Sequence, residues 1–183
     1  RLGDKIVFLT GSTDLAVLDS LILLDTAREA EILTGQAIGE ISENIKPAVF
    51  QETLSFAVEL AGRGREGKPV GTIFALGDEE KVMPLSKQMI INPFKGYSDD
   101  ERNILNPAIR ETLREFTAID GAFIIASDGR VLTAGRYLSA AGNDNDIPQG
   151  LGARHMASAG ITSLTKAVAI VISESTGAVR IFK

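Results

Sequence analysis

The sequence contains no cysteine and only one histidine, and these two absences limit its chemistry. Without cysteine the chain has no disulfide, no thiolate nucleophile and no cysteine-ligated zinc. A single histidine cannot build a multi-histidine metal site, which leaves open a hard cation held by carboxylates. No apolar run approaches the roughly 20 residues that cross a bilayer, and we therefore expect no membrane partner.

An excess of positive charge is also missing, because the 183 residues carry a formal net charge of −5. Binding to nucleic acid without sequence preference needs a basic face that displaces counterions from phosphates, so we expect no nucleic-acid partner. A hydrophobic content of 44% with 23% charged residues is ordinary for a globular protein. Since the chain begins at Arg1 with neither methionine nor a signal segment, we expect a cytoplasmic piece of a longer protein.

Residues 1–35 are interpreted as a small α/β appendage. The apolar run at residues 5–10 predicts a strand, and the apolar spacings of residues 15–33 predict a helix after a turn at residues 11–14. This turn lacks the second glycine, the lysine and the hydroxyl of a phosphate-binding loop, so no chemistry is assigned to it. A glycine at each end of residues 35–39 indicates a boundary there.

Residues 36–183 are predicted to form one mixed α/β domain, with a central mixed β-sheet flanked by helices. Helices are expected from about residue 45 to 60, after Asn106-Pro107, and at residues 152–165. The capping-box spacing of Ser98 and Glu101 predicts a further short helix. Asp128-Gly129 is typical of a hairpin turn. Apolar runs predict strands at residues 70–76, 122–126, 131–134, 167–173 and 178–182.

Three polar clusters lie at the ends of these predicted elements. The first is Asp120-Gly121-Ala122. A carboxylate at a strand entrance can hold a divalent cation, and the glycine after it lets a ligand approach the backbone. The alternative is that Asp120 merely caps a turn, as Asp-Gly pairs often do.

The second and third clusters flank the last predicted helix and the strand after it. Arg154 and His155 fall in the first turn of the helix, where free N–H groups and the helix dipole favour an anion. The alternative is a solvated arginine beside a histidine with a local hydrogen bond. Ser173-Glu174 follows the strand. The Ser173 hydroxyl suits a terminal phosphate, with the Glu174 carboxylate near a metal. The alternative is that the pair forms a plain turn.

Taken in order, the clusters resemble the diadenylate cyclase family, whose signatures are a DGA motif, an RHR motif and an SEETG-like turn. The likeness extends through residues 70–78 (VGTIFALGD), 91–97 (INPFKGY), 129–138 and 167–183, and so covers about residues 45–183. Several motifs in the right order and context rarely match by chance.

This chain departs from the family pattern at three positions. Met156 stands where the family usually has the third RHR residue, Ala153 replaces a threonine that often precedes the motif, and Ser175 replaces the second acid of the turn. One guanidinium and one hydroxyl are thus lost from phosphate binding. Such variants resemble archaeal members, which carry an extra α/β domain before the cyclase, and residues 1–35 are interpreted as its end.

The resemblance implies an enzyme that condenses two ATP molecules into cyclic di-AMP and releases two pyrophosphates, in a site formed by two facing protomers. Asp120 would hold Mg²⁺ or Mn²⁺ and orient the attacking 3′-hydroxyl, with Glu174 supporting the metal. The phosphates would be held by Ser173 and by the segment Gly152, Ala153, Arg154, His155 and Met156. Tyr137 and Leu138 resemble the segment that contacts adenine.

Two other classes of function stay open from the sequence. A catalytically silent nucleotide-binding sensory module would explain the missing motif arginine, although retention of Asp120 argues against it. A structural domain that uses the Arg-His cluster only as an interface would leave the joint order of the motifs unexplained.

Overall fold

The computed structural model describes residues 5–12, 17–25, 44–139 and 152–183. The chain divides into two compact units, Arg1–Ile38 and Gly39–Lys183. The interpretation of the first unit as the end of another domain stays a prediction. The predicted boundary at residues 35–39 lies outside the described residues.

The first unit contains a two-stranded antiparallel hairpin of β1 (Lys5–Ser12) and β2 (Val17–Asp25). The strand predicted at residues 5–10 is confirmed. The helix predicted over residues 15–33 is wrong over residues 17–25, and residues 26–33 are not described. Short apolar runs fit a helix or a strand equally well by periodicity, and here pairing with β1 satisfies the backbone hydrogen bonds.

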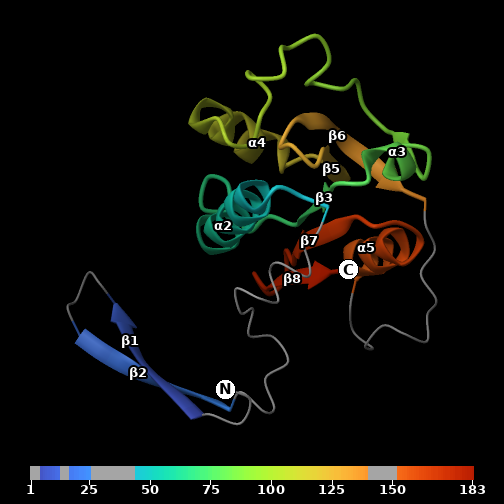
Figure 1. Cartoon of the computed structure of the whole chain (residues 1–183). Helices are drawn as coiled ribbons and strands as arrows, with labels where there is room; N and C mark the ends of the chain where they lie inside the picture. The colour runs from blue at the N-terminus through green and yellow to red at the C-terminus, as the bar shows by residue number, and fades with distance from the viewer. Residues whose placement is uncertain (1–4, 13–16, 26–43, 140–151) are drawn as a thin grey trace. The chain divides into compact units, whose positions relative to one another are not determined.

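The second unit is built on a mixed sheet, as predicted, and Figure 1 shows its arrangement. The sheet has six strands, one more than the five expected from apolar runs, because β4 was not predicted. The strand order is β4-β6-β5-β3-β7-β8, in which β3 and β5 run parallel and every other neighbouring pair is antiparallel. The strands are β3 (Thr72–Leu76), β4 (Ser86–Gln88), β5 (Ala122–Ile125), β6 (Val131–Leu138), β7 (Val168–Ile172) and β8 (Val179–Phe182).

Two long helices, α2 (Pro47–Arg63) and α5 (Ala153–Leu164), cover opposite faces of this sheet (Figure 1). On one face Ile73 belongs to a core cluster with Ile161 of α5. On the other face the rings of Phe74 and Phe56 of α2 lie 5.9 Å apart. Because the central strands are buried on both faces, they appear in the sequence as continuous apolar runs rather than alternating ones.

The remaining helices are short: α3 (Glu79–Val82), η1 (Pro107–Ile109) and α4 (Arg110–Phe116). The start predicted at Asn106-Pro107 is confirmed, because the Asn106 side chain accepts a hydrogen bond from the Ala108 N–H. Arg114 of α4 pairs with Glu59 of α2 at 2.6 Å. This ion pair and the Arg110–Glu59 pair join the two helices.

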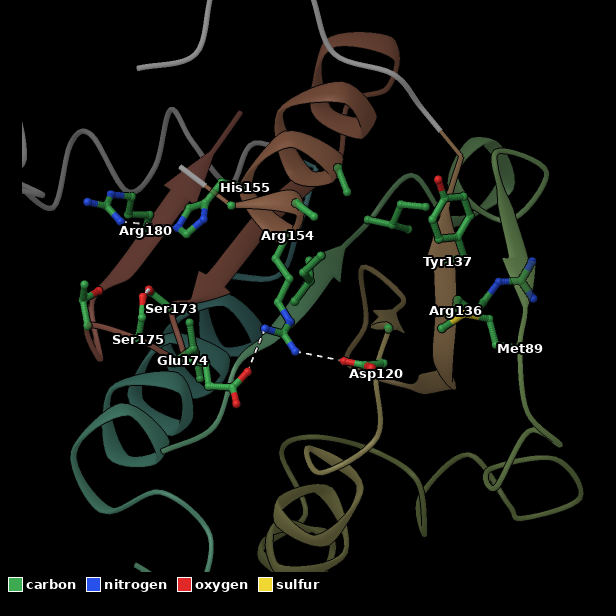
Figure 2. Close-up of a pocket in the computed structure, with 18 residues that line it drawn as sticks. Met89, Asp120, Arg136, Tyr137, Arg154, His155, Ser173, Glu174, Ser175 and Arg180 are labelled. Atoms are coloured by element: carbon green, nitrogen blue, oxygen red, sulfur yellow. Dashed lines mark hydrogen bonds and ion pairs between the residues drawn. The ribbon is translucent and has the colours of Figure 1, made fainter. Parts of the chain in front are cut away.

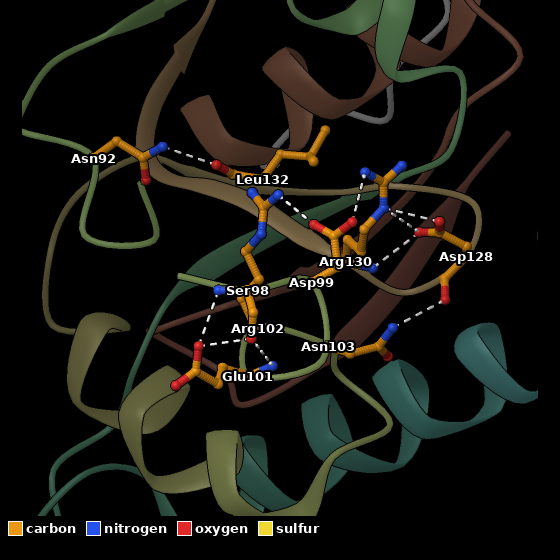
Figure 3. A network of polar contacts seen from close by, with 9 residues as sticks. All are labelled: Asn92, Ser98, Asp99, Glu101, Arg102, Asn103, Asp128, Arg130 and Leu132. Carbon is orange, nitrogen blue, oxygen red and sulfur yellow. Dashed lines mark hydrogen bonds and ion pairs between the residues drawn. The ribbon is translucent and has the colours of Figure 1, made fainter. Parts of the chain in front are cut away.

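A polar network fastens the long segment between β4 and η1 to the β5–β6 hairpin (Figure 3). Asn92 Nδ2 donates to the Leu132 carbonyl at 2.8 Å, and Asn103 Nδ2 donates to the Asp128 carbonyl at 3.3 Å. Arg130 also pairs with Asp128 at 2.8 Å. The network therefore holds the hairpin at its turn.

The same segment contains one incorrect prediction. Ser98 and Glu101 make the expected capping-box bonds: the Ser98 N–H donates to Glu101 Oε2 at 2.9 Å, and the Glu101 N–H donates to Ser98 Oγ at 3.4 Å. The residues after Ser98 nevertheless form turns instead of the predicted short helix. The backbone here pairs with the hairpin, because the Val131 N–H donates to the Arg102 carbonyl, and this competes with a helical path.

Candidate active site

The predicted functional clusters meet at one edge of the sheet because of its mixed topology. Since β3 and β5 are parallel and β6 and β7 are antiparallel to them, β3 and β5 begin at the edge where β6 and β7 end. Asp120 precedes β5, Glu174 follows β7 and Tyr137 lies near the end of β6. The first turn of α5, which carries Arg154, lies at the same edge (Figure 2).

A cavity of about 830 Å³ lies at this edge. All of the residues predicted for the site line it except Ala122 and Met156. Ala122 is fully buried in β5 opposite Ile73, beneath the cavity, and Met156 is half-buried on α5. The structure thus brings together residues of all three clusters and leaves Ala122 and Met156 outside the lining.

Arg154 bridges the two carboxylates that the sequence predicts as metal ligands (Figure 2). Its Nη2 donates to Asp120 Oδ1 at 3.0 Å, and its Nη1 donates to Glu174 Oε2 at 3.1 Å. The Asp120 side chain is 88% exposed and that of Glu174 is 59% exposed, whereas that of Arg154 is 31% exposed. The Arg154 guanidinium thus supplies the positive charge between Asp120 and Glu174.

Two glycines leave room for close contacts in the lining of the cavity. A Cβ at Gly71 would lie 2.5 Å from Arg154 Nη1 and 2.8 Å from the Glu174 Cβ, so any other residue there would require the bridge to shift. Gly121 has a φ of +112°, and a Cβ there would lie 2.8 Å from the Arg136 nitrogen. Gly121 was predicted from its motif, but no role was assigned to Gly71 because its neighbours come from distant segments.

The two ends of the cavity differ in chemistry (Figure 2). Met89 and Tyr137 lie at one end, and Ser173, Ser175 and Arg180 lie at the other. The cavity lining also includes residues that the sequence did not single out as site residues: Ile73, Met89, Arg136, Ala157, Ile172, Thr176 and Arg180. A signal for Arg180 was present, because it interrupts the last apolar strand (VRIF).

His155 is buried beside the cavity, only 5% exposed, with its ring 6.1 Å from that of Phe182. Its Nε2 lies 3.3 Å from Arg180 Nη1. Arginine can only donate, so Nε2 accepts and Nδ1 carries the hydrogen. Burial, followed by the positive charges of Arg180 and Arg154, lowers the pKa of His155 below its usual value.

This lowered pKa predicts a pH-dependent stability. The unfolded chain binds a proton on His155 near pH ~6.5, while the folded chain resists protonation, so the free energy of unfolding should fall as the pH drops from about 7.5 to below the folded pKa. Urea unfolding at several pH values measures this slope. In a His155→Gln variant the slope should be reduced between about pH 7.5 and 5.5, and an equal slope in both proteins would contradict the assignment.

Among residues 44–139 and 152–183 and the two N-terminal strands, no helix is long and apolar enough to cross a membrane.

Residues 59–183 match the protein family described as DAC, the DisA bacterial checkpoint controller nucleotide-binding domain. The chain belongs to the DAC family. The resemblance carried by the three clusters is therefore confirmed. A relative named diadenylate cyclase, from Methanocaldococcus jannaschii, is 39% identical over 182 residues, which cover 99% of the DAC chain and 58% of the relative.

A second relative named diadenylate cyclase, from Haloferax volcanii, is 44% identical over 137 residues, covering 75% of the DAC chain and 50% of the relative. The DAC chain thus spans little more than half the length of these curated relatives. Among solved structures, DacA from Staphylococcus aureus has a TM-score of 0.51 at 22% identity, covering 73% of the DAC chain and 80% of DacA.

A hypothetical membrane spanning protein from Bacillus cereus has a TM-score of 0.58 at 17% identity, covering 80% of the DAC chain and 66% of that chain. At these identities the two structures show a shared fold alone.

The DAC chain offers Asp120 and Glu174 as oxygen donors for a divalent cation. No group of three or more histidine, cysteine, aspartate or glutamate side chains suited to a metal occurs in the described part of the chain. Two carboxylates nevertheless fit Mg²⁺ or Mn²⁺, because such ions usually keep several waters and take substrate phosphate oxygens as further ligands. Both acids already point at a positive group, the Arg154 guanidinium.

Proposed function

We propose that this chain is the catalytic domain of a diadenylate cyclase, which joins two ATP molecules into cyclic di-AMP and releases two pyrophosphates. The observation that carries the proposal is one cavity whose lining includes residues of all three family motifs. Its volume of about 830 Å³ falls in the usual range for small-molecule sites. Membership of the DAC family and two relatives named diadenylate cyclase support the same reaction.

The chemistry of the cavity favours one orientation of ATP. Tyr137, with Leu138 beside it and Met89 nearby, offers an aromatic and apolar surface for adenine. The triphosphate then runs toward the first turn of α5, where backbone N–H groups without helical partners and the helix dipole favour anions. Arg154 and the Ser173 hydroxyl lie along that path.

In the proposed reaction the 3′-oxygen of one ATP attacks the α-phosphorus of the other, and the bond from that phosphorus to the bridging oxygen of pyrophosphate breaks. Asp120 orients the attacking 3′-hydroxyl. The proton of that hydroxyl passes to a carboxylate or to water. Arg154 and the N–H groups of α5 neutralise charge that develops on the phosphate oxygens. A divalent cation on Asp120 and Glu174 would supply further charge neutralisation. Most of the rate enhancement comes from alignment.

The site of one protomer is half of the proposed catalytic site. Asp120 is 88% exposed at the cavity, so its carboxylate is accessible to a nucleotide held by a second copy of the chain. Two copies that face each other across a two-fold axis would each present one ATP to the other. The homodimer, like the cation, is part of the proposal.

Incubation with ATP and Mn²⁺ or Mg²⁺, followed by chromatography, tests the function, and cyclic di-AMP is the expected product. ATP that is bound but unchanged would indicate a silent sensory module, and absence of binding would indicate a structural domain.

Specific activity should rise with protein concentration at saturating ATP, because the dimer forms by mass action. A flat specific activity at dilutions where ultracentrifugation shows only monomer would refute the two-protomer site.

A further inference from the structure

Arg180 is an arginine of the cavity to which the three motifs assign no role. It lies in β8 opposite Val171 of β7, and it is half-buried. Figure 2 shows its side chain next to His155, on the side away from Arg154. The residues that turn the chain from β7 into β8 place three hydroxyl groups at the same end of the cavity, those of Ser173, Ser175 and Thr176.

Arg180 differs from the other two arginines of the cavity in its partners. Arg154 pairs with two carboxylates. Arg136 donates to the carbonyls of Met83 and Ser86 at 2.9 and 2.7 Å. Within the described part of the chain, Arg180 has no carboxylate within ion-pair distance, and its polar contact is with His155 Nε2.

A half-buried guanidinium without a counter-ion is a poor structural element and a good anion receptor. Arginine stays charged at every physiological pH, and partial burial without a carboxylate costs free energy that an incoming anion recovers. Its planar fork matches two phosphate oxygens at once. The positive charge of Arg180 also contributes to the lowered pKa of the neighbouring His155. This end of the cavity therefore offers the Arg180 guanidinium and several hydroxyl donors to an anion.

We propose that Arg180 binds the terminal phosphates of the nucleoside triphosphate and thereby makes the site select triphosphates over diphosphates and monophosphates. This inference rests on the proposed function and names a specificity-determining residue for it. With adenine at Tyr137 and the α-phosphate near Arg154, the far end of a triphosphate reaches the hydroxyl turn and Arg180, whereas a monophosphate does not. From β8, Arg180 supplies a cationic donor beside His155, in the first turn of α5, where Met156 supplies none.

Titration calorimetry of the full chain with ATP, ADP and AMP in the presence of Mg²⁺ tests the proposal. Arg180→Gln should weaken ATP binding by about ten- to a hundredfold, weaken ADP binding less, and leave AMP binding unchanged. Arg180→Lys should be intermediate, because lysine keeps the charge but not the fork. Arg63→Gln is the matched control, since Arg63 is 79% exposed on α2 and does not line the cavity, and it should bind all three nucleotides as the parent does.

Three results would overturn the inference, and they separate it from the proposed function. An unchanged ATP affinity in Arg180→Gln overturns the inference and leaves the cyclase proposal intact. Equal weakening for ATP, ADP and AMP shows a general structural effect and also overturns it. A parent chain that binds no ATP overturns both. If circular dichroism shows that Arg180→Gln is unfolded, Arg180→Lys decides, and its ratio of ATP to ADP affinity must fall below that of the parent.

Discussion

Replacement of Asp120 by asparagine is expected to abolish cyclic di-AMP formation while the fold is kept. The substitution preserves size but removes the negative charge that would hold the cation and orient the 3′-hydroxyl. We expect a rate loss of about a thousandfold or more, as for other groups that stabilise charge in a transition state. The stability should change little, because the side chain is 88% exposed and its ion pair with Arg154 is largely solvated.

The measurement is turnover of ATP by the purified variant, with circular dichroism and urea unfolding as checks of folding. Asp99→Asn is a matched control, because Asp99 is also an exposed aspartate paired with an arginine, Arg102, but it lies outside the cavity. The control should keep parental activity. Parental turnover in folded Asp120→Asn would show that this carboxylate does not act in the reaction.

Arg154→Ala should weaken ATP binding by about ten- to a hundredfold or more. Each charge-assisted contact is worth roughly 1.5–3 kcal/mol, and neither Ala153 nor Met156 has a side-chain donor that can replace it. The substitution also removes the guanidinium that pairs with both Asp120 and Glu174. The negative charge of these two carboxylates would then repel a triphosphate. Arg154→Lys should recover part of the affinity, because it restores the charge without the two-pronged geometry.

Calorimetric dissociation constants for ATP, ADP and AMP distinguish this arginine from Arg180. Arg154 lies beside Asp120, so its removal should weaken binding of all three nucleotides, whereas the proposed role of Arg180 concerns the terminal phosphates alone. An ATP dissociation constant that does not change in Arg154→Ala would mean that the phosphates bind elsewhere.

Local signals in the sequence predicted most elements of the main unit. The β-branched run at residues 167–173 predicted β7 because a strand buried on both faces needs apolar side chains throughout. Asn106 and Pro107 marked a helix start through capping chemistry, which depends on adjacent residues only. The helix predicted over residues 17–25 was wrong because the structure there does not depend on adjacent residues alone. These residues form a strand by pairing with another strand, β1.

The contacts within the candidate site were harder to predict from the sequence than the helices and strands. The resemblance predicted Asp120, Arg154 and Glu174 as site residues, but the ion pairs of Arg154 with the two acids depend on the strand order of the sheet. Gly71 and Arg180 were missed for the same reason. The role of Gly71 depends on a side chain that arrives from α5, and that of Arg180 depends on the register of β8 against β7.

The glycine at position 71 also determines how this site tolerates mutation. Every other amino acid adds a Cβ, which would lie 2.5 Å from the Arg154 guanidinium and 2.8 Å from the Glu174 side chain. Any replacement at position 71 therefore requires Arg154 and Glu174 to shift, although glycine carries no functional group and no charge. A single methyl group there would displace the Arg154 side chain without altering any ionisable residue, so that a mutational scan restricted to polar residues would overlook one of the constraints on the charged centre.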